Sequence, residues 1–347
     1  MTTPNSLEET ARALVASGKG ILAADETVAT ISKRFDALAI VSTPETRRAY
    51  RELLFTTPEL GQYISGAILY DETIHQKDAR GVPFPEVLTR AGIMTGIKVD
   101  TGAKPLAACP GESVTEGLDG LRRRLEEYAE LGARFAKWRA VIRVSETLPS
   151  DTCIEVNANA LARYAALCQE RALVPIVEPE VLMEGAHSLE RAEEVTAAVL
   201  ERVFAALRAQ RVLLEGMLLK PNMVVAGKSC PERPSVAAVA AATLRVLRRQ
   251  VPVAVPGVVF LSGGQDAHAA TAHLNAMNAG RQPWQLSFSF ARALQDPALA
   301  AWSGRPAGVP AGQRALFHRA RCNGAASLGS WDDSLEAVMP EMGMTVH

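Results

Sequence analysis

The sequence predicts one α/β domain, a closed barrel of eight parallel strands alternating with helices, the (β/α)8 TIM-barrel class. Three observations lead to this fold class. Eight short, largely apolar segments suit strands that are covered on both faces. Stretches with helical periodicity lie between them, and strands alternating with helices indicate a parallel sheet with right-handed crossovers. Eight such units favour a closed barrel over an open, doubly wound sheet.

The expected elements follow one another along the chain. The strands are expected at Gly20–Asp25, Ile64–Tyr70, Ile93–Val99, Arg134–Trp138, Leu173–Glu178, Val212–Lys220, Gly257–Ser262 and Gln285–Phe290. The clearest helical periodicity is found in Glu45–Phe55, Leu118–Leu131, Asn157–Arg171, Leu189–Ala209, Ser235–Gln250 and Ala267–Asn278. Ser6, with Glu9 three residues later, has the spacing of a capping box, which predicts an early helix with apolar positions at Leu7, Ala11 and Leu14.

No linker rich in proline, glycine or serine interrupts this pattern, so we expect a single domain over residues 1–347. The barrel is expected at about residues 18–303, and a C-terminal helix and mobile tail at 304–347. Within that last part, SGRPAGVPAGQ, which begins at Ser303, is typical of a loop, and Arg314–Leu328 of a final helix.

Composition excludes several classes of protein. Hydrophobic residues make up 48% and charged residues 22% of the 347-residue chain, which is typical of a soluble globular protein with a sizeable core. The formal net charge of −1 argues against nucleic acid or an acidic membrane as a partner. The N-terminal residues lack the basic start and apolar run of a signal peptide, and no uncharged stretch is long enough to span a bilayer, so a cytoplasmic location is expected.

The cysteines and histidines predict no metal site and no disulfide framework. The five cysteines are odd in number, far apart and never spaced as CxxC. The six histidines show no HExxH or similar spacing, so they are interpreted as surface or structural groups. The glycine-rich dinucleotide signature is absent after every expected strand, and we expect no cofactor.

Charged side chains lie near the C-terminal ends of five expected strands: Asp25, Lys98, Lys137, Glu178 and Lys220. Active sites of such barrels are built at that end, from several strands. A single charge there commonly marks only the point where the chain leaves the core, but five at the same end indicate an arranged site. Glu180 and Arg139 lie two residues after Glu178 and Lys137, and side chains two apart on a strand share a face.

Lys220 is the candidate nucleophile. It follows the apolar run LLEGMLL and precedes Pro221, which ends the strand. A lysine with an ordinary pKa of about 10.4 is only about 0.04% unprotonated at pH 7. Burial beside Lys98 and Lys137 would lower that pKa, because loss of water and repulsion by the two neighbouring cations both disfavour the charged amine. Lowering the pKa of Lys220 from about 10.4 to about 7 would cost about 4.6 kcal/mol, at about 1.36 kcal/mol per pKa unit. An uncharged amine could then add to a ketone.

A phosphate site is indicated after the last two expected strands. Ser262-Gly263-Gly264 ends the seventh strand, and Arg292 follows the eighth. Glycines let backbone N–H groups approach an anion, and arginine offers two parallel donors. Barrels commonly bind phosphate at these loops. Each feature alone is also compatible with an ordinary turn or helix start, and their combination favours an anion site.

Several segments together resemble class I fructose-bisphosphate aldolases, from about Gly18 to Leu328. They are GKGILAADE (18–26), GIKVD (96–100), FAKWR (135–139), PIVEPE (175–180), LEGMLLKPNM (214–223) and FLSGGQ (260–265). The EG-x-LLKP segment is the most specific of these. The resemblance implies a metal-independent lyase that cleaves fructose 1,6-bisphosphate to dihydroxyacetone phosphate and glyceraldehyde 3-phosphate in glycolysis and gluconeogenesis. It also suggests a homo-tetramer.

The resemblance further implies a role for each site residue. Lys220 would form the Schiff base with the C2 ketone, and Glu178 would be the acid/base, supported by Glu180 and Lys137. Asp25 would accept the proton of the C4 hydroxyl. The phosphate contacts would be Ser262, Gly263 and Arg292 at C1, and Arg34, Lys98 and Lys33 at C6, with Arg47 and Arg139 as secondary contacts.

The chain departs from the family pattern at two places. The usual Tyr-Gly before the phosphate arginine is Phe290-Ala291 here, which narrows the allowed backbone conformations. The family usually ends in a tyrosine, tied to protonation of the enamine and to preference for the bisphosphate. This chain has no tyrosine after Tyr164 and ends in Thr345-Val346-His347. Either His347 replaces that tyrosine, or the end is disordered.

Two alternatives remain open from the sequence. One is another lysine-imine aldolase, or this one adapted to sedoheptulose bisphosphate or fructose 1-phosphate. The other is a catalytically silent barrel that serves as a protein-binding scaffold. The joint presence of Asp25, Lys137, Glu178 and Lys220 argues against the second alternative.

Overall fold

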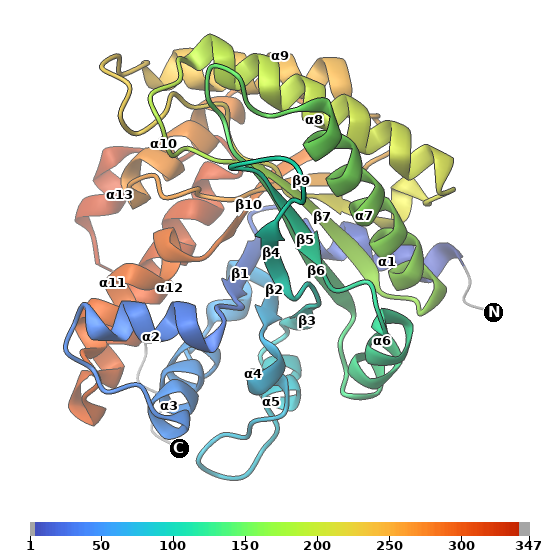
Figure 1. Ribbon diagram of the computed structural model, residues 1–347. Helices are drawn as coiled ribbons and strands as arrows, with labels where there is room; N and C mark the ends of the chain where they lie inside the picture. The colour runs from blue at the N-terminus through green and yellow to red at the C-terminus, as the bar shows by residue number, and fades with distance from the viewer. Residues whose placement is uncertain (1–3, 340–347) are drawn as a thin grey trace.

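Eight parallel strands close into a barrel in the computed structural model, which describes residues 4–339 (Figure 1). Around the barrel the strands run in the order β1-β10-β9-β8-β7-β6-β3-β2. Their bounds are β1 (Gly20–Ala24), β2 (Ile64–Leu69), β3 (Met94–Lys98), β6 (Phe135–Ile142), β7 (Val174–Val181), β8 (Leu218–Leu219), β9 (Gly257–Phe260) and β10 (Gln285–Phe290). The predicted closed barrel is therefore confirmed.

Helices surround the strands, and all six of the clearly periodic segments are helical (Figure 1). The helices are α1 (Pro4–Leu14), α2 (Val28–Asp36), α3 (Pro44–Phe55), α4 (Asp71–Ile74), α5 (Phe84–Arg90), α6 (Leu121–Glu130), α7 (Asp151–Glu170), α8 (Leu189–Ala209), α9 (Val236–Gln250), α10 (Ala267–Met277), α11 (Arg292–Trp302), α12 (Val309–Ala326) and α13 (Asp333–Ala337). Within residues 4–339, no helix combines the length and the apolar character needed to cross a membrane.

Three local expectations were wrong. The stretch after Ser303 is not a loop throughout: a short 3-10 turn leads into α12, whose first turn holds Pro310, a position where proline's missing N–H costs nothing. Ser6 does not cap α1, because the helix begins at Pro4. Most of Val212–Lys220 is not strand. A 3-10 turn occupies Leu214–Gly216, and only two residues pair as β8.

Other elements gave no clear signal in the sequence. The hairpin of β4 (Gly102–Pro105) and β5 (Ser113–Glu116) is polar and largely exposed, so it lacks an apolar run. Helix α11 holds Pro297 in its interior, a residue that ordinarily argues against a helix.

Helix α1 closes the N-terminal end of the barrel. Leu7, Ala11 and Leu14 are buried in the same apolar cluster as the barrel residues Ile21 and Phe135. The hydroxyl of Ser65, near the start of β2, donates a hydrogen bond to the Leu14 carbonyl, at 2.5 Å. The N-terminal end is thus filled with apolar side chains, which leaves the C-terminal ends of the strands for polar groups.

Gly96 in β3 allows the ring of Phe135 to fill the barrel interior. A Cβ atom at Gly96 would lie 2.2 Å from the Phe135 ring, far inside van der Waals contact. We expect Gly96→Ala to lower the free energy of unfolding by about 1–3 kcal/mol through overpacking, as measured by urea denaturation. Gly280→Ala is the matched control, because nothing lies within 4 Å of its Cβ position and its φ is not positive. Equal destabilisation by the two changes would contradict this packing account.

Candidate active site

A cavity of about 740 Å³ lies at the C-terminal ends of the strands. It brings together residues from β1, β3, β6, β7 and the ends of β8, β9 and β10. The predicted site residues that line it are Asp25, Lys33, Arg34, Lys98, Lys137, Arg139, Glu178, Glu180, Lys220, Ser262, Gly263 and Arg292. The residues chosen because they lie at the C-terminal ends of the expected strands, or in the loops that follow, therefore share one cavity.

Glu178 lies between two lysines at the centre of the cavity. One carboxylate oxygen, Oε1, lies 3.3 Å from Nζ of Lys220, and the other, Oε2, lies 3.4 Å from Nζ of Lys137. Lys137 in turn lies 2.7 Å from Oδ2 of Asp25. All four side chains are buried, with Lys220, Lys137 and Glu178 each 4% exposed. The two lysines and two carboxylates therefore form one desolvated, charge-balanced group.

Backbone pairing fixes where Lys220 emerges. Its N–H still donates a sheet hydrogen bond to the carbonyl of Val177 on β7, at 2.8 Å. The preceding residue, Leu219, pairs with Val177 on one side and Val258 on the other. Lys220 is therefore the first residue beyond β8, and its side chain enters the cavity beside Glu178, the residue after Val177.

The charges in this group decide its protonation. Burial alone would raise the pKa of Asp25, but the positive charges of Lys137 and Lys220 outweigh burial and hold that pKa at about 2. Burial would likewise lower the pKa of Lys137, and the charges of Asp25 and Glu178 raise it instead. At neutral pH, Asp25 is an anion and Lys137 a cation.

The surroundings of Lys220 differ from the sequence expectation. The sequence argument expected the nearby cations Lys98 and Lys137 to lower the pKa of Lys220. In the structure Glu178 separates Lys220 from Lys137, and Lys98 is paired with Asp100 through a 2.6 Å contact to Oδ1. Lysine–lysine repulsion is therefore balanced by carboxylates.

A second layer of ion pairs holds the cavity wall. Arg139 pairs with Glu180, and its backbone N–H donates to Oδ2 of Asp100 at 3.2 Å. Arg34 pairs with Glu26 and, at 2.7 Å, with Asp296. Sequence analysis missed Glu26 and Asp100, although Glu26 directly follows Asp25 and Asp100 lies two residues after Lys98.

The loop after β9 has the backbone shape that an anion site needs. Gly263 and Gly264 both have positive φ, at 58° and 82°. A Cβ on Gly264 would lie 2.8 Å from both the Arg292 guanidinium and Nζ of Lys228, so glycine lets these two cations approach the loop. Nearby, the Ser289 hydroxyl is buried, lines the cavity and has no hydrogen-bond partner among the described residues. Lys228 and Ser289 were missed in the sequence.

The barrel order separates two cationic regions of the cavity. Strands β9 and β3 are four positions apart in the ring of eight, so they face one another across the barrel. The loop after β9 carries Ser262 and Gly263, whereas β3 ends at Lys98. Lys220 follows β8, the neighbour of β9. The cavity can thus hold a ligand with an anionic group at each end and a carbonyl near one of them.

The donor set suits an organic anion. No histidine or cysteine is among the described residues that line the cavity, and its carboxylates are paired with lysine or arginine. A family model described as fructose-bisphosphate aldolase class-I matches residues 6–346 of the chain. The chain belongs to the class I fructose-bisphosphate aldolase family.

Individual relatives agree with this family. A probable fructose-bisphosphate aldolase class 1 of Xanthomonas axonopodis pv. citri is 59% identical over 327 residues, which cover 94% of this chain and 98% of the relative. Fructose-bisphosphate aldolase B of Gallus gallus is 50% identical, covering 94% of this chain and 90% of the relative. A ternary co-crystal structure of fructose-bisphosphate aldolase from Plasmodium falciparum, in complex with TRAP and a small-molecule inhibitor, matches with a TM-score of 0.93 and 49% identity. The match covers 94% of this chain and 95% of the chain in that structure. The predicted family, lyase class and barrel fold are confirmed.

Arg47, one of the residues considered for an aldolase site, is not in the cavity. Arg47 on α3 donates two hydrogen bonds to Glu72, at 2.8 and 2.6 Å, and does not line the cavity. His347, with Thr345 and Val346, lies outside the described residues. At the other departure from the aldolase pattern, Ala291 lines the cavity beside Arg292, which begins α11.

Proposed function

We propose that this chain cleaves fructose 1,6-bisphosphate to dihydroxyacetone phosphate and glyceraldehyde 3-phosphate, through a Schiff base on Lys220. The observation that carries the proposal is the contact of the buried Lys220 amine with Glu178, 3.3 Å apart, next to the glycine-rich loop after β9. A nucleophilic amine, an acid and an anion site are thereby combined in one cavity.

The first step joins Lys220 to the substrate. The neutral amine adds to the C2 carbonyl to form a carbinolamine. Before this addition Glu178 takes a proton from Lys220, and after it Glu178 returns that proton to the C2 hydroxyl, which leaves as water and gives an iminium. Oε2 of Glu178 accepts no hydrogen bond from the described residues, so the carboxyl group has capacity for this transfer. Glu180 and Lys137 support it, Lys137 by direct contact.

The second step breaks the C3–C4 bond. Asp25 accepts the C4 hydroxyl proton, the electron pair of the bond moves to the iminium, glyceraldehyde 3-phosphate departs, and an enamine of dihydroxyacetone phosphate remains on Lys220. With a pKa of about 2, Asp25 is a weak base, so the electron-accepting iminium must drive the proton transfer. Lys137 contacts both Asp25 and Glu178 and would balance charge as the proton moves.

The two phosphates would occupy the opposite cationic regions. The C1 phosphate is adjacent to C2, so it belongs beside Lys220, with Ser262, Gly263 and Arg292. The C6 phosphate would lie toward Lys98, with Arg34 and Lys33 on α2. Arg139 is proposed as a secondary contact, whereas Arg47 would first have to leave Glu72. The strand order and the lining residues support this assignment.

Comparing kcat/KM on three ketoses tests the substrate. Fructose 1,6-bisphosphate is expected to be cleaved better than fructose 1-phosphate, because only the bisphosphate reaches the cations around Lys98. Sedoheptulose bisphosphate is the competing substrate. Equal kcat/KM values for fructose 1-phosphate and fructose 1,6-bisphosphate would contradict the proposed C6-phosphate site. If none of the three ketoses were cleaved, a catalytically silent scaffold would be favoured.

Metal removal is expected to leave the activity unchanged, because the iminium supplies the electron sink that a metal would otherwise provide. The measurement is fructose 1,6-bisphosphate cleavage before and after exhaustive dialysis against EDTA. Loss of activity on chelation, restored by a divalent cation, would contradict a Schiff-base mechanism. No cofactor is required by this proposal.

We also propose a single cytoplasmic folding unit that assembles into a homo-oligomer, a tetramer by resemblance to the family. All five cysteines are free, in keeping with a reducing compartment. Analytical ultracentrifugation would give the oligomeric state, and a single transition in chemical denaturation would support one domain.

A further inference from the structure

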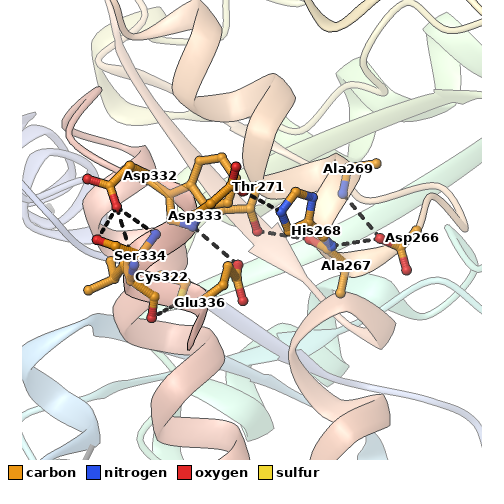
Figure 2. A network of polar contacts seen from close by, with 12 residues as sticks. Asp266, Ala267, His268, Ala269, Thr271, Cys322, Asp332, Asp333, Ser334 and Glu336 are labelled. Carbon is orange, nitrogen blue, oxygen red and sulfur yellow. Dashed lines mark hydrogen bonds and ion pairs between the residues drawn. The ribbon is translucent and has the colours of Figure 1, made fainter. Parts of the chain in front are cut away.

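Three potential metal ligands meet where α12 packs against α13. His318 and Cys322 lie one turn apart on α12, and Glu336 lies on α13, and the ligand atoms of the three are within 4.8 Å of one another. His318 and Cys322 are buried, and Glu336 is partly buried. None of the three lines the active-site cavity. Figure 2 shows Cys322 and Glu336 near the Asp332–Ser334 turn and His268.

The distance between His318 and Glu336 suits shared ligation of a cation better than a direct hydrogen bond. Nε2 of His318 lies 3.8 Å from Sγ of Cys322 and 3.6 Å from Oε2 of Glu336. An N–H···O hydrogen bond is about 2.7–3.2 Å long. Around a tetrahedral zinc ion, bonds of about 2.0–2.3 Å place neighbouring ligand atoms about 3.4–3.6 Å apart. Two of the three distances are therefore close to the spacing that a central cation requires, and the third, between Cys322 and Glu336, is within 4.8 Å.

We propose that His318, Cys322 and Glu336 bind one zinc-type divalent cation between α12 and α13. Imidazole nitrogen, thiolate sulfur and carboxylate oxygen are the donors that zinc uses, and a water would complete the tetrahedron. On binding, the Cys322 thiol loses its proton to solvent and its sulfur bonds to the metal, with no change in oxidation state.

Nδ1 of His318 has no hydrogen-bond partner among the described residues, so no hydrogen bond at that atom fixes the ring orientation.

Arg319 is the competitor for the carboxylate. Its NH1 lies 2.6 and 2.5 Å from the two oxygens of Glu336. The cation must therefore share Glu336 with a guanidinium, which weakens binding. The same contact supplies a test, because removing Arg319 is expected to increase the affinity of the site for a metal. If Glu336 served only as the ion-pair partner of Arg319, the affinity would not increase.

The site would fix the segment that leads into α13 against α10. Asp333 contacts His268 (Figure 2), with Oδ1 3.0 Å from Nε2 of the ring. The Trp331 ring packs against the same histidine, with centroids 5.0 Å apart. Helix α10 begins directly after the loop of Ser262 and Gly263, capped by Asp266. Any effect of the cation on catalysis, through the loop of Ser262 and Gly263, rests on the proposed function. Binding of the cation itself does not. Sequence analysis missed the site because H-x3-C is not one of the common zinc spacings.

Cobalt(II) titration of the full-length, chelator-treated protein tests the proposal. Wild type is expected to bind one equivalent, with a thiolate-to-cobalt charge-transfer band that zinc abolishes by displacement. Cys322→Ser is expected to lose the band, and Cys109→Ser, a half-buried free cysteine elsewhere, to keep it. Arg319→Gln is expected to lower the dissociation constant about tenfold, the gain of one charge-assisted contact.

Two results would overturn the proposal: no thiolate band in the wild type, or a band of equal intensity in Cys322→Ser, which would indicate adventitious binding. Circular dichroism of each variant separates loss of the ligand from loss of the fold. A folded Arg319→Gln variant with no gain in affinity would also count against the site. None of these readouts requires catalytic activity, so failure here leaves the aldolase proposal intact.

Discussion

Replacing Lys220 by methionine is expected to abolish cleavage of fructose 1,6-bisphosphate, with a loss in kcat of at least about 10⁴-fold. Methionine keeps an unbranched side chain of similar length but has no amine, so neither the carbinolamine nor the iminium can form. Borohydride added with dihydroxyacetone phosphate is expected to trap one covalent adduct per wild-type chain, located by mass spectrometry on the peptide that contains Lys220.

Lys104→Met is the matched control, because Lys104 is an exposed lysine of the β4–β5 hairpin that does not line the cavity. This variant is expected to keep both activity and the adduct. An adduct of equal yield in Lys220→Met would move the nucleophile to another lysine. The buried charge balance also predicts a structural effect. Removing Lys220 leaves Glu178 with Lys137 alone, so the unfolding free energy of each variant should be compared before activity is interpreted.

The barrel was predictable because each of its strands is buried on both faces. Burial of this kind requires apolar runs, and β1, β2, β3 and β10 have nearly the bounds that were expected. Strands β6 and β7 extend to Ile142 and Val181, beyond their expected ends at Trp138 and Glu178. The region before Lys220 was harder, because an apolar run of the same composition forms a 3-10 turn and only a two-residue strand. Periodicity alone cannot distinguish a buried strand from a buried turn. The polar β4–β5 hairpin carries no such signal at all.

The site was predictable as a set of residues but not as a set of pairs. Parallel strands bring their C-terminal ends to one face, so a charge at the end of each strand points to the cavity wherever the strand lies in the ring. Which charges meet depends on the strand order and on side-chain direction. Lys137 on β6 reaches Asp25 after β1, across the barrel, and no spacing in the sequence encodes that contact. The sequence names Asp25 and Glu178 as site residues, but for the same reason it does not show which lysine each of them contacts.

Glu178→Gln is expected to lower kcat by about 10²–10⁴-fold, the range for losing a general acid. Glutamine keeps the size of the side chain but cannot transfer a proton, so dehydration of the carbinolamine should become slow. The change leaves the Lys220 amine in place, so addition of the amine to the ketone remains possible. The defect should therefore appear after substrate binding, as a slow approach to the borohydride-trapped adduct with little change in KM.

Glu180→Gln is the control on the same strand face. Glu180 is also buried, but its ion-pair partner is Arg139, with no contact to either central lysine among the described residues. Its loss should weaken the cavity wall and cost less in kcat than the loss of Glu178. If the two variants had equal kcat, or if Glu178→Gln formed the trapped adduct at the wild-type rate, the acid would have to be a different group. Asp25 would then be a poor replacement, because a carboxyl group with a pKa of about 2 is ionised at neutral pH and holds no proton to give.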